Sequence, residues 1–150
     1  MRMPGNCTIY CTNGDVSTIQ SVIDGLFPGS KAKVTSAGEC QVKLKGEEKS
    51  TLQLTFMRFQ ENGDDFCRLR LSTSVFIKGR TKGQSRFREY LCEKIQACSV
   101  AVGVVAEPDF DTDDRFPQLC YALAEALDGV MFDGTDFFNA EDEVLAEIAI

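Results

Sequence analysis

Apolar and polar residues alternate along this chain with two different periods, which separate predicted strands from predicted helices. Period-two alternation covers residues 7–11, and then residues 40–44 and 52–56 on either side of a polar turn. This pattern predicts a strand followed by a β-hairpin with one face in water. The alternation returns at residues 67–71, after a second polar turn, and predicts a further antiparallel strand.

Apolar residues at helical spacing predict four helices, one of them at the end of the chain. They start near Val16, Ser85, Arg115 and Asn139. The predicted N-terminal caps are Asn13 or Asp15 for the first helix, Ser85 for the second, Asp113 or Asp114 for the third and Asn139 for the last. Gly129 suits the C-terminal cap of the third helix. Residues 72–84 contain two glycines and keep no period, which indicates a mobile loop.

The run at residues 100–106 is apolar except for Gly103, as expected of a strand covered on both faces. Pro108 ends this strand, and the usual crossover rule makes the short strand at 130–132 parallel to it. The order of elements predicts an α+β fold with a mixed, largely antiparallel sheet and helices packed on it, for which the ferredoxin-like split βαβ plan is a candidate. We expect residues 1–150 to form a single domain, which is either a whole protein or the N-terminal domain of a longer one.

Several kinds of chemistry are excluded by composition. The 150 residues contain no histidine, which rules out a Ser-His-Asp triad, a Cys-His pair and any zinc site with histidine ligands. The seven cysteines are scattered and never spaced as C-x-x-C, which indicates small buried residues in a reducing compartment. Neither a signal peptide nor a membrane span is visible, so we expect a cytoplasmic protein. No cofactor is expected.

Charge is unevenly distributed. Residues 107–150 hold thirteen acids and one base, a net charge of −12, while residues 1–106 hold fifteen bases and ten acids, a net charge of +5. The two parts either neutralise each other in the fold or bind partners separately. The candidate residues for binding an anion or a partner are Lys78, Arg80, Lys82, Arg86 and Arg88. The Walker glycine-lysine pattern is absent there, and a simple solvated loop is the competing interpretation. The sequence does not favour a nucleic-acid partner, because few aromatic residues are interleaved with these lysines and arginines.

Carboxylates cluster in the turn at residues 107–114, where Glu107, Asp109 and Asp111 are the candidate metal ligands. Two known patterns fail there. A calcium loop starting at Asp109 would need glycine where Asp114 stands and glutamate where Cys120 stands. The phosphatase motif D-x-D-x-[TV] is likewise broken in its fifth position. Alternatively, the turn only stops a strand and caps a helix.

Four segments together resemble a known family. They are "NCTIYCT" with the helix after it, "REYLCEKIQACSVAVGVVAEP" and "LAEALDGVMF". In these segments the chain is similar to the N-terminal region of the bacterial family called domain of unknown function 4272, over most of residues 6–145. Members of that family continue into a helical C-terminal region, which this chain lacks. The family has no established activity, so the resemblance implies no catalytic residue.

The leading hypothesis is a non-enzymatic module that binds a protein partner or a C-terminal domain, or that forms a homodimer through its last helix. One alternative is a metal- or phosphate-dependent enzyme that uses the acidic turn at 107–114 and the basic loop at 78–88. The other is an acidic inhibitor that mimics nucleic acid. No membrane partner is expected.

Overall fold

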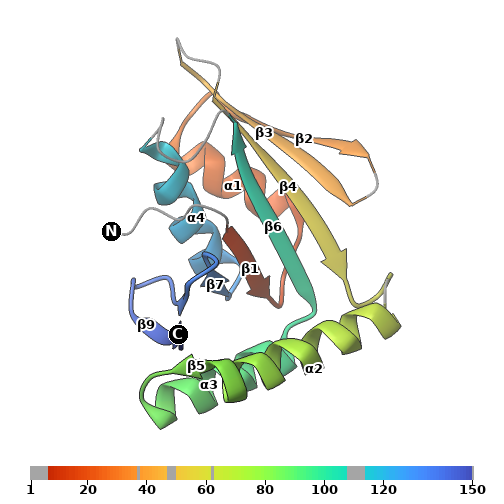
Figure 1. Ribbon diagram of the computed structural model, residues 1–150. Coiled ribbons are helices and arrows are strands. Elements are labelled where there is room, and N and C mark those ends of the chain that lie inside the picture. Colours follow the sequence, from red (N-terminus) through yellow and green to blue (C-terminus); the bar gives the residue numbers. More distant parts are fainter. Residues whose placement is uncertain (1–6, 37, 47–49, 62, 108–113, 150) are drawn as a thin grey trace.

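The strands that the structure describes pair into one antiparallel sheet, and helices pack on both of its faces (Figure 1). The computed structural model describes residues 7–36, 38–46, 50–61, 63–107 and 114–149. The strands are β1 (Cys7–Cys11), β2 (Lys31–Ser36), β3 (Glu39–Leu44), β4 (Ser50–Arg58), β5 (Thr81–Lys82), β6 (Val100–Glu107), β7 (Val130–Phe132), β8 (Asp136–Phe138) and β9 (Val144–Ile148). The helices are α1 (Val16–Leu26), α2 (Gly63–Arg80), α3 (Ser85–Ala97) and α4 (Arg115–Ala126).

The centre of the sheet has the ferredoxin-like plan. The strand order is β2-β3-β4-β6-β1-β7-β8-β9-β5. Because β6 lies antiparallel between β4 and β1, those two strands point the same way, and α1 lies in the crossover that joins them. Likewise β6 and β7 point the same way on either side of β1, with α4 between them. Two such interleaved β-α-β units define the split βαβ arrangement, so the predicted α+β class is confirmed.

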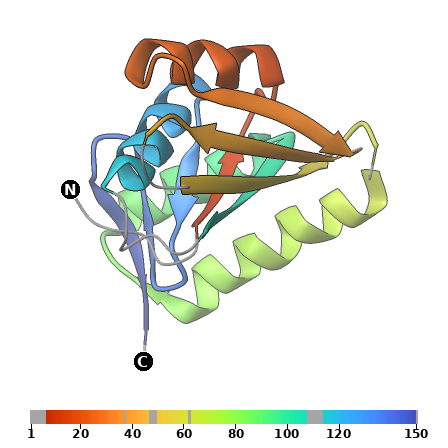
Figure 2. The same cartoon turned by 90° about the horizontal axis from the view of Figure 1, so that it is seen from above.

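Two insertions extend this plan. The β2–β3 hairpin widens the sheet before β4, and α2 and α3 stand between β4 and β6, which a plain ferredoxin-like chain joins directly. In Figure 1, α2 and α3 cross the lower end of the sheet, below the β2–β3 hairpin. Seen from above, α1 covers one face of the sheet and α2 lies under the other (Figure 2).

Two separate hydrophobic cores follow from this arrangement. The first core fills the face under α1 and α4 and runs along all the central strands; Ile9, Ile19 and Phe116 are fully buried there. The second core lies between the other face and α2 and α3; it includes Phe66 and Phe137. Burying one such side chain contributes about 1.5–3 kcal/mol, so each core stabilises the helices packed on it.

The predicted strand at 67–71 and loop at 72–84 are wrong, since α2 runs continuously from Gly63 to Arg80. Its inner face carries Phe66, Arg70, Thr73 and Ile77 at helical spacing. Arg70 can face inward because its guanidinium lies 5.1 Å from the Phe66 ring centre and its Nε donates to the Cys98 carbonyl at 2.8 Å. The polar residues on this face hid the helical period, while the alternating cysteine and leucines imitated a strand.

The predicted last helix is also wrong, and so is the homodimer contact proposed for it. Residues 136–138 and 144–148 form the β8–β9 hairpin. The Asn139 side chain does accept backbone N–H bonds, from Glu141 at 3.1 Å and Glu143 at 2.9 Å, as a helix cap would. Asp142 then takes a left-handed backbone with φ 64°, which reverses the chain instead of continuing a helix. Leu145 is buried in the second core rather than left for a partner.

The helix ends agree only in part with the predicted caps. Asp15 caps α1, accepting the Ser17 N–H at 3.2 Å, whereas α3 starts after Gln84 and α4 after Asp114 without a side-chain cap bond. At the end of α4 the left-handed residue is Asp128, not Gly129. Gly129 is needed for another reason, because a Cβ there would lie 2.9 Å from the Tyr10 carbonyl oxygen. Asp113 and Pro108 lie outside the described residues.

The predicted burial of the cysteines is confirmed for six of the seven, while Cys67 on α2 is exposed; all seven are free thiols. Ion pairs connect the basic part of the chain to the acidic part: Lys94 lies 2.8 Å from Asp128, and Lys82 lies 4.0 Å from Glu147. No helix in the described ranges is both long enough and apolar enough to cross a bilayer.

Candidate functional site

The five predicted anion-binding residues surround the connection between α2 and α3. Lys78 and Arg80 end α2, Lys82 lies in β5, and Arg86 and Arg88 lie in the first turns of α3. They do not converge. Lys82 pairs with Glu147, and the Arg86 guanidinium lies 4.9 Å from the ring centre of Phe87.

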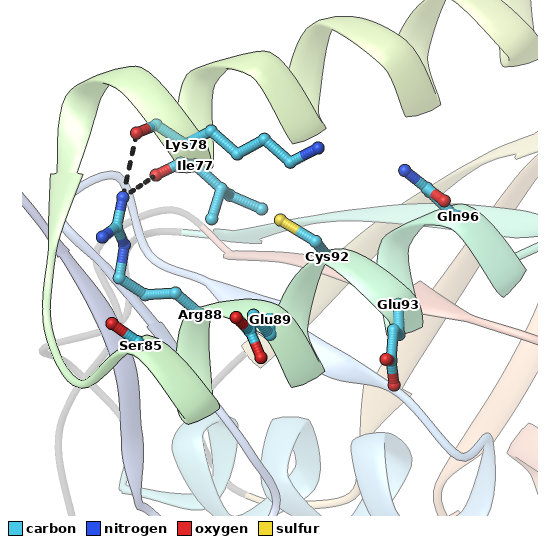
Figure 3. Close-up of a pocket in the computed structure, with 8 residues that line it drawn as sticks. All are labelled: Ile77, Lys78, Ser85, Arg88, Glu89, Cys92, Glu93 and Gln96. Atoms are coloured by element: carbon cyan, nitrogen blue, oxygen red, sulfur yellow. Dashed lines mark hydrogen bonds between the residues drawn. The ribbon is translucent and has the colours of Figure 1, made fainter.

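Two of the five, Lys78 and Arg88, line a hollow of about 480 Å³ between α2 and α3 (Figure 3). The Nη2 of Arg88 donates to the carbonyl oxygens of Ile77 at 3.1 Å and Lys78 at 2.9 Å. Arg88 therefore caps the C-terminal end of α2, where carbonyls lack helical partners and a cation is favourable. Because its Nη2 atom is engaged by these carbonyls, Arg88 has fewer N–H donors left for an anion.

The thiol of Cys92 points into the hollow toward Ile77 and Lys78 (Figure 3). Burial raises the pKa of this thiol, and the nearby charges of Lys78 and Arg88 offset only part of that effect. Because the nucleophilic form of cysteine is the thiolate, a thiol held in its protonated form is not an activated nucleophile. Glu89 and Glu93 also line the hollow, which therefore carries both signs of charge.

A second hollow, of about 490 Å³, lies where β1 and β4 end and α1 begins. A helix N-terminus attracts anions, but here the Asp15 carboxylate already occupies that position. Arg58 is engaged as well, donating to the Gly14 carbonyl at 2.9 Å while lying over the Phe56 ring. Neither hollow presents a free, convergent set of charged groups.

The predicted metal ligands cannot be placed as a group. Glu107 is the last residue of β6, and its side chain, like all of Asp109 and Asp111, lies outside the described part of the chain. Within the described part, histidine, cysteine and carboxylate residues nowhere gather in threes as a metal site would require. The metal hypothesis for the acidic turn stays a prediction.

A third candidate is a sheet surface that we call the open face. It is the part of the second face of the sheet that α2 and α3 leave uncovered, on strands β2, β3, β4 and β6. Its side chains are those of Lys31, Lys33, Glu39, Gln41, Lys43, Thr51, Gln53, Thr55, Met57 and Val105. Glu39 is the acid among these side chains, and its carboxylate accepts a hydrogen bond from the Ser36 hydroxyl at 3.1 Å. They are all exposed or half-buried, and on β3, β4 and β6 their neighbours along the strand point into the first core.

Strand register arranges this face in rows. One row runs Lys33, Gln41, Gln53 and Val105 across four strands. The next begins with Lys31 directly opposite Lys43. Like charges directly opposite each other destabilise a strand pair. None of these three lysines forms an ion pair within the described residues.

Exposed apolar side chains also lie on the open face, at a distance from the lysines. Val105 is in the row of Lys33 but three strands away, and Met57 is six residues along β4 from Thr51, which faces Lys43. Val105 is 52% exposed and Met57 is 37% exposed. A protein-binding surface commonly combines apolar area with charged groups at its rim. Sequence analysis missed this site, although it predicted the wet face of the β3–β4 hairpin, which carries Gln41, Lys43 and Gln53. Sequence analysis did not predict β2, and this strand supplies Lys31 and Lys33 beside Lys43.

Comparison with protein-family models, with curated proteins and with solved structures found no match to this chain.

Proposed function

We propose that this protein is a non-enzymatic binding module whose open face docks an acidic segment of a protein partner. The observation that carries this proposal is the lysine corner formed by Lys31, Lys33 and Lys43, which have no ion pair with any described residue. A carboxylate placed between Lys31 and Lys43 would relieve the repulsion between them.

The chemistry of the open face favours an acidic protein over a nucleic acid. Single-stranded nucleic acid binds sheets through exposed aromatic rings on which bases stack. Tyr10, the aromatic residue of β1 on this side of the sheet, is instead buried in the second core. The net charge of −7 for the whole chain further weakens attraction to phosphate.

Fluorescence anisotropy with a labelled peptide of alternating glutamate and valine tests the proposal. We expect Lys33→Glu to weaken binding by about tenfold, because it turns an attraction into a repulsion, and we expect added salt to weaken binding of the unaltered protein. Lys78→Glu is the matched control, an exposed lysine outside the open face, and should bind normally. Equal losses in both variants, or no binding by the unaltered protein, would refute the proposal. Labelled oligouridine should bind more weakly than the peptide.

A further inference from the structure

The outer edge of β2 has backbone hydrogen-bonding groups that pair with no other described strand. This strand is the last in the sheet order, and β3 is its neighbour on the inner side. Its residues are exposed except for Ala32, which is half-buried. The opposite edge of the sheet is β5, which has only two residues. The β2 edge is therefore the longer of the two and the better template for another strand.

One side chain shows which backbone groups point outward. The Gln20 Oε1 atom accepts the Ala32 N–H at 2.9 Å, and the Gln20 Nε2 atom lies 3.4 Å from the Ser30 carbonyl oxygen, to which it donates. Backbone groups alternate between the two sides of an edge strand. Since the Ala32 N–H points outward, the N–H and C=O of Val34, two residues later, point outward as well.

Gln20 thus mimics the backbone of a neighbouring strand, but it covers only the first part of the edge. Its amide supplies one acceptor and one donor, as a peptide group would. The edge beyond it, from the Ala32 carbonyl to Ser36, has the outward N–H and C=O of Val34 at its centre. That segment is long enough for a short extended peptide to pair with.

Side chains on the two sides of β2 define what such a peptide would carry. Lys31 and Lys33 project on the open face, while Val34 projects on the other side and is 56% exposed. A matching strand would alternate acidic residues, beside the lysines, with apolar residues, beside Val34. A second copy of β2 would instead bring its own lysines against these, which disfavours self-association.

We propose that the acidic segment binds by strand addition, pairing its backbone with Val34 at the outer edge of β2 and directing its carboxylates onto the open face. This inference rests on the proposed function, because it assigns the geometry by which the same partner is held. The partner is an extended protein segment in which glutamate or aspartate alternates with apolar residues.

Three changes test strand addition with the labelled glutamate-valine peptide. Val34→Pro removes the outward N–H and should weaken binding by about tenfold, since proline is tolerated at sheet edges but donates no bond. A peptide N-methylated at alternate residues, which leaves the protein unaltered, should lose binding when the methyl groups face β2. Gln20→Ala uncovers the first part of the edge and should strengthen binding severalfold. Hydrogen exchange of the Val34 amide should slow by about tenfold when the unmodified peptide binds.

The outcomes separate the two proposals. Loss of binding in Lys33→Glu, with full binding of the N-methylated peptide and unchanged Val34 exchange, would overturn strand addition and leave the open face as the docking surface. No loss in Lys33→Glu would overturn the proposed function itself. A folded Val34→Pro variant is recognised by its unchanged far-ultraviolet circular dichroism. If that variant unfolds, the N-methylated peptide and the Val34 exchange rate still decide the question.

Discussion

The two halves of the second sheet face show how one set of strands can serve a core and a surface. In the half under α2 and α3, residues such as Tyr10 and Phe137 are buried. In the open half, the same face carries lysine, glutamine and threonine. The boundary crosses β6, where Ala101 is 8% exposed and Val105, four residues later, is 52% exposed. Helix coverage, and not strand identity, therefore decides which residues on this face of the sheet must be apolar.

The first sheet face, which α1 and α4 cover over its central strands, should give the largest loss of stability. Phe116 in α4 is fully buried there, and Phe116→Ala should lower the free energy of unfolding by about 3–5 kcal/mol, through lost burial and the cavity left behind. Urea denaturation measures this change. Met57→Ala on the open face is the control and should cost less than about 1 kcal/mol. Similar losses in both variants would mean that a further part of the chain covers the open face.

Val104 and Val105 compare the two faces at neighbouring positions of one strand. Val104 is 1% exposed, so Val104→Thr buries a hydroxyl and should cost about 1–3 kcal/mol of unfolding free energy. Val105→Thr keeps the branched side chain on the open face and should change stability by less than about 0.5 kcal/mol. Urea midpoints of the two variants give the comparison, and a reversed order would contradict the register of β6.

Alkaline pH should destabilise the first core, because it ionises thiols that are buried there. Burial raises the pKa of Cys11 to about 12 from an ordinary value of 9.0. The unfolded chain loses this proton first, so the stabilisation is complete below pH 9 and is lost as the pH rises from 9 toward 12. The loss is about 1.4 kcal/mol per pH unit in that window. Urea unfolding from pH 7 to 10.5 should show a shallower decline in Cys11→Ala. The exposed Cys67 provides the control, since Cys67→Ala should decline as the unaltered protein does.

A buried hydroxyl marks an imperfection in the covered half. The Ser74 Oγ in α2 is buried and has no hydrogen-bond partner among the described residues. Ser74→Ala removes an unsatisfied polar group, so stability should stay the same or increase by up to about 1 kcal/mol. Thermal or urea unfolding tests this, with Thr73→Ser, at the neighbouring buried hydroxyl, as a comparison that keeps the polar group. A loss of more than about 1 kcal/mol would show that Ser74 has a partner.

The smallest expected effect concerns the open half. Lys43→Glu replaces the repulsion across from Lys31 with an attraction and should raise the free energy of unfolding by about 0.2–1 kcal/mol. Urea unfolding at low salt measures the gain, which high salt should reduce. The same variant should bind the acidic peptide less well. A variant that is less stable and binds normally would contradict the role assigned to this lysine pair.

Sequence was sufficient where one face of an element is apolar and the other polar. The period-two alternation of Cys40, Val42 and Leu44 placed β3 correctly, and the apolar spacing of Phe116 and Leu119 predicted α4. It failed for α2, where Arg70 and Thr73 face inward and break the apolar stripe. It failed again near Asn139, where local capping signals suit a tight turn as well as a helix. Long-range pairing decided the outcome in that region, and local pattern does not encode it.

The open face could be predicted only in part. The polar side of the β3–β4 hairpin was visible in the sequence, including Lys43 and Gln53. That Lys31 lies opposite Lys43 depends on the pairing of β2, and that no helix covers this side within the described residues depends on where α2 and α3 dock. Both are properties of the assembled sheet. The acidic turn, with Asp109 and Asp111, and the resemblance to domain of unknown function 4272 stay predictions.

The insertion of α2 and α3 between β4 and β6 also shapes how the chain must fold. These two strands form the longest pairing in the sheet, from Thr51 opposite Glu107 to Arg58 opposite Val100. In a direct hairpin, a short turn would hold β4 and β6 together. Here about 40 residues separate the two strands, and closing this loop costs entropy that grows with its length. The α2–α3 pair is itself local in sequence, so its contacts can form early and shorten the effective loop. The two helices that border the open face would then also bring β4 and β6, at the centre of the sheet, close together during folding.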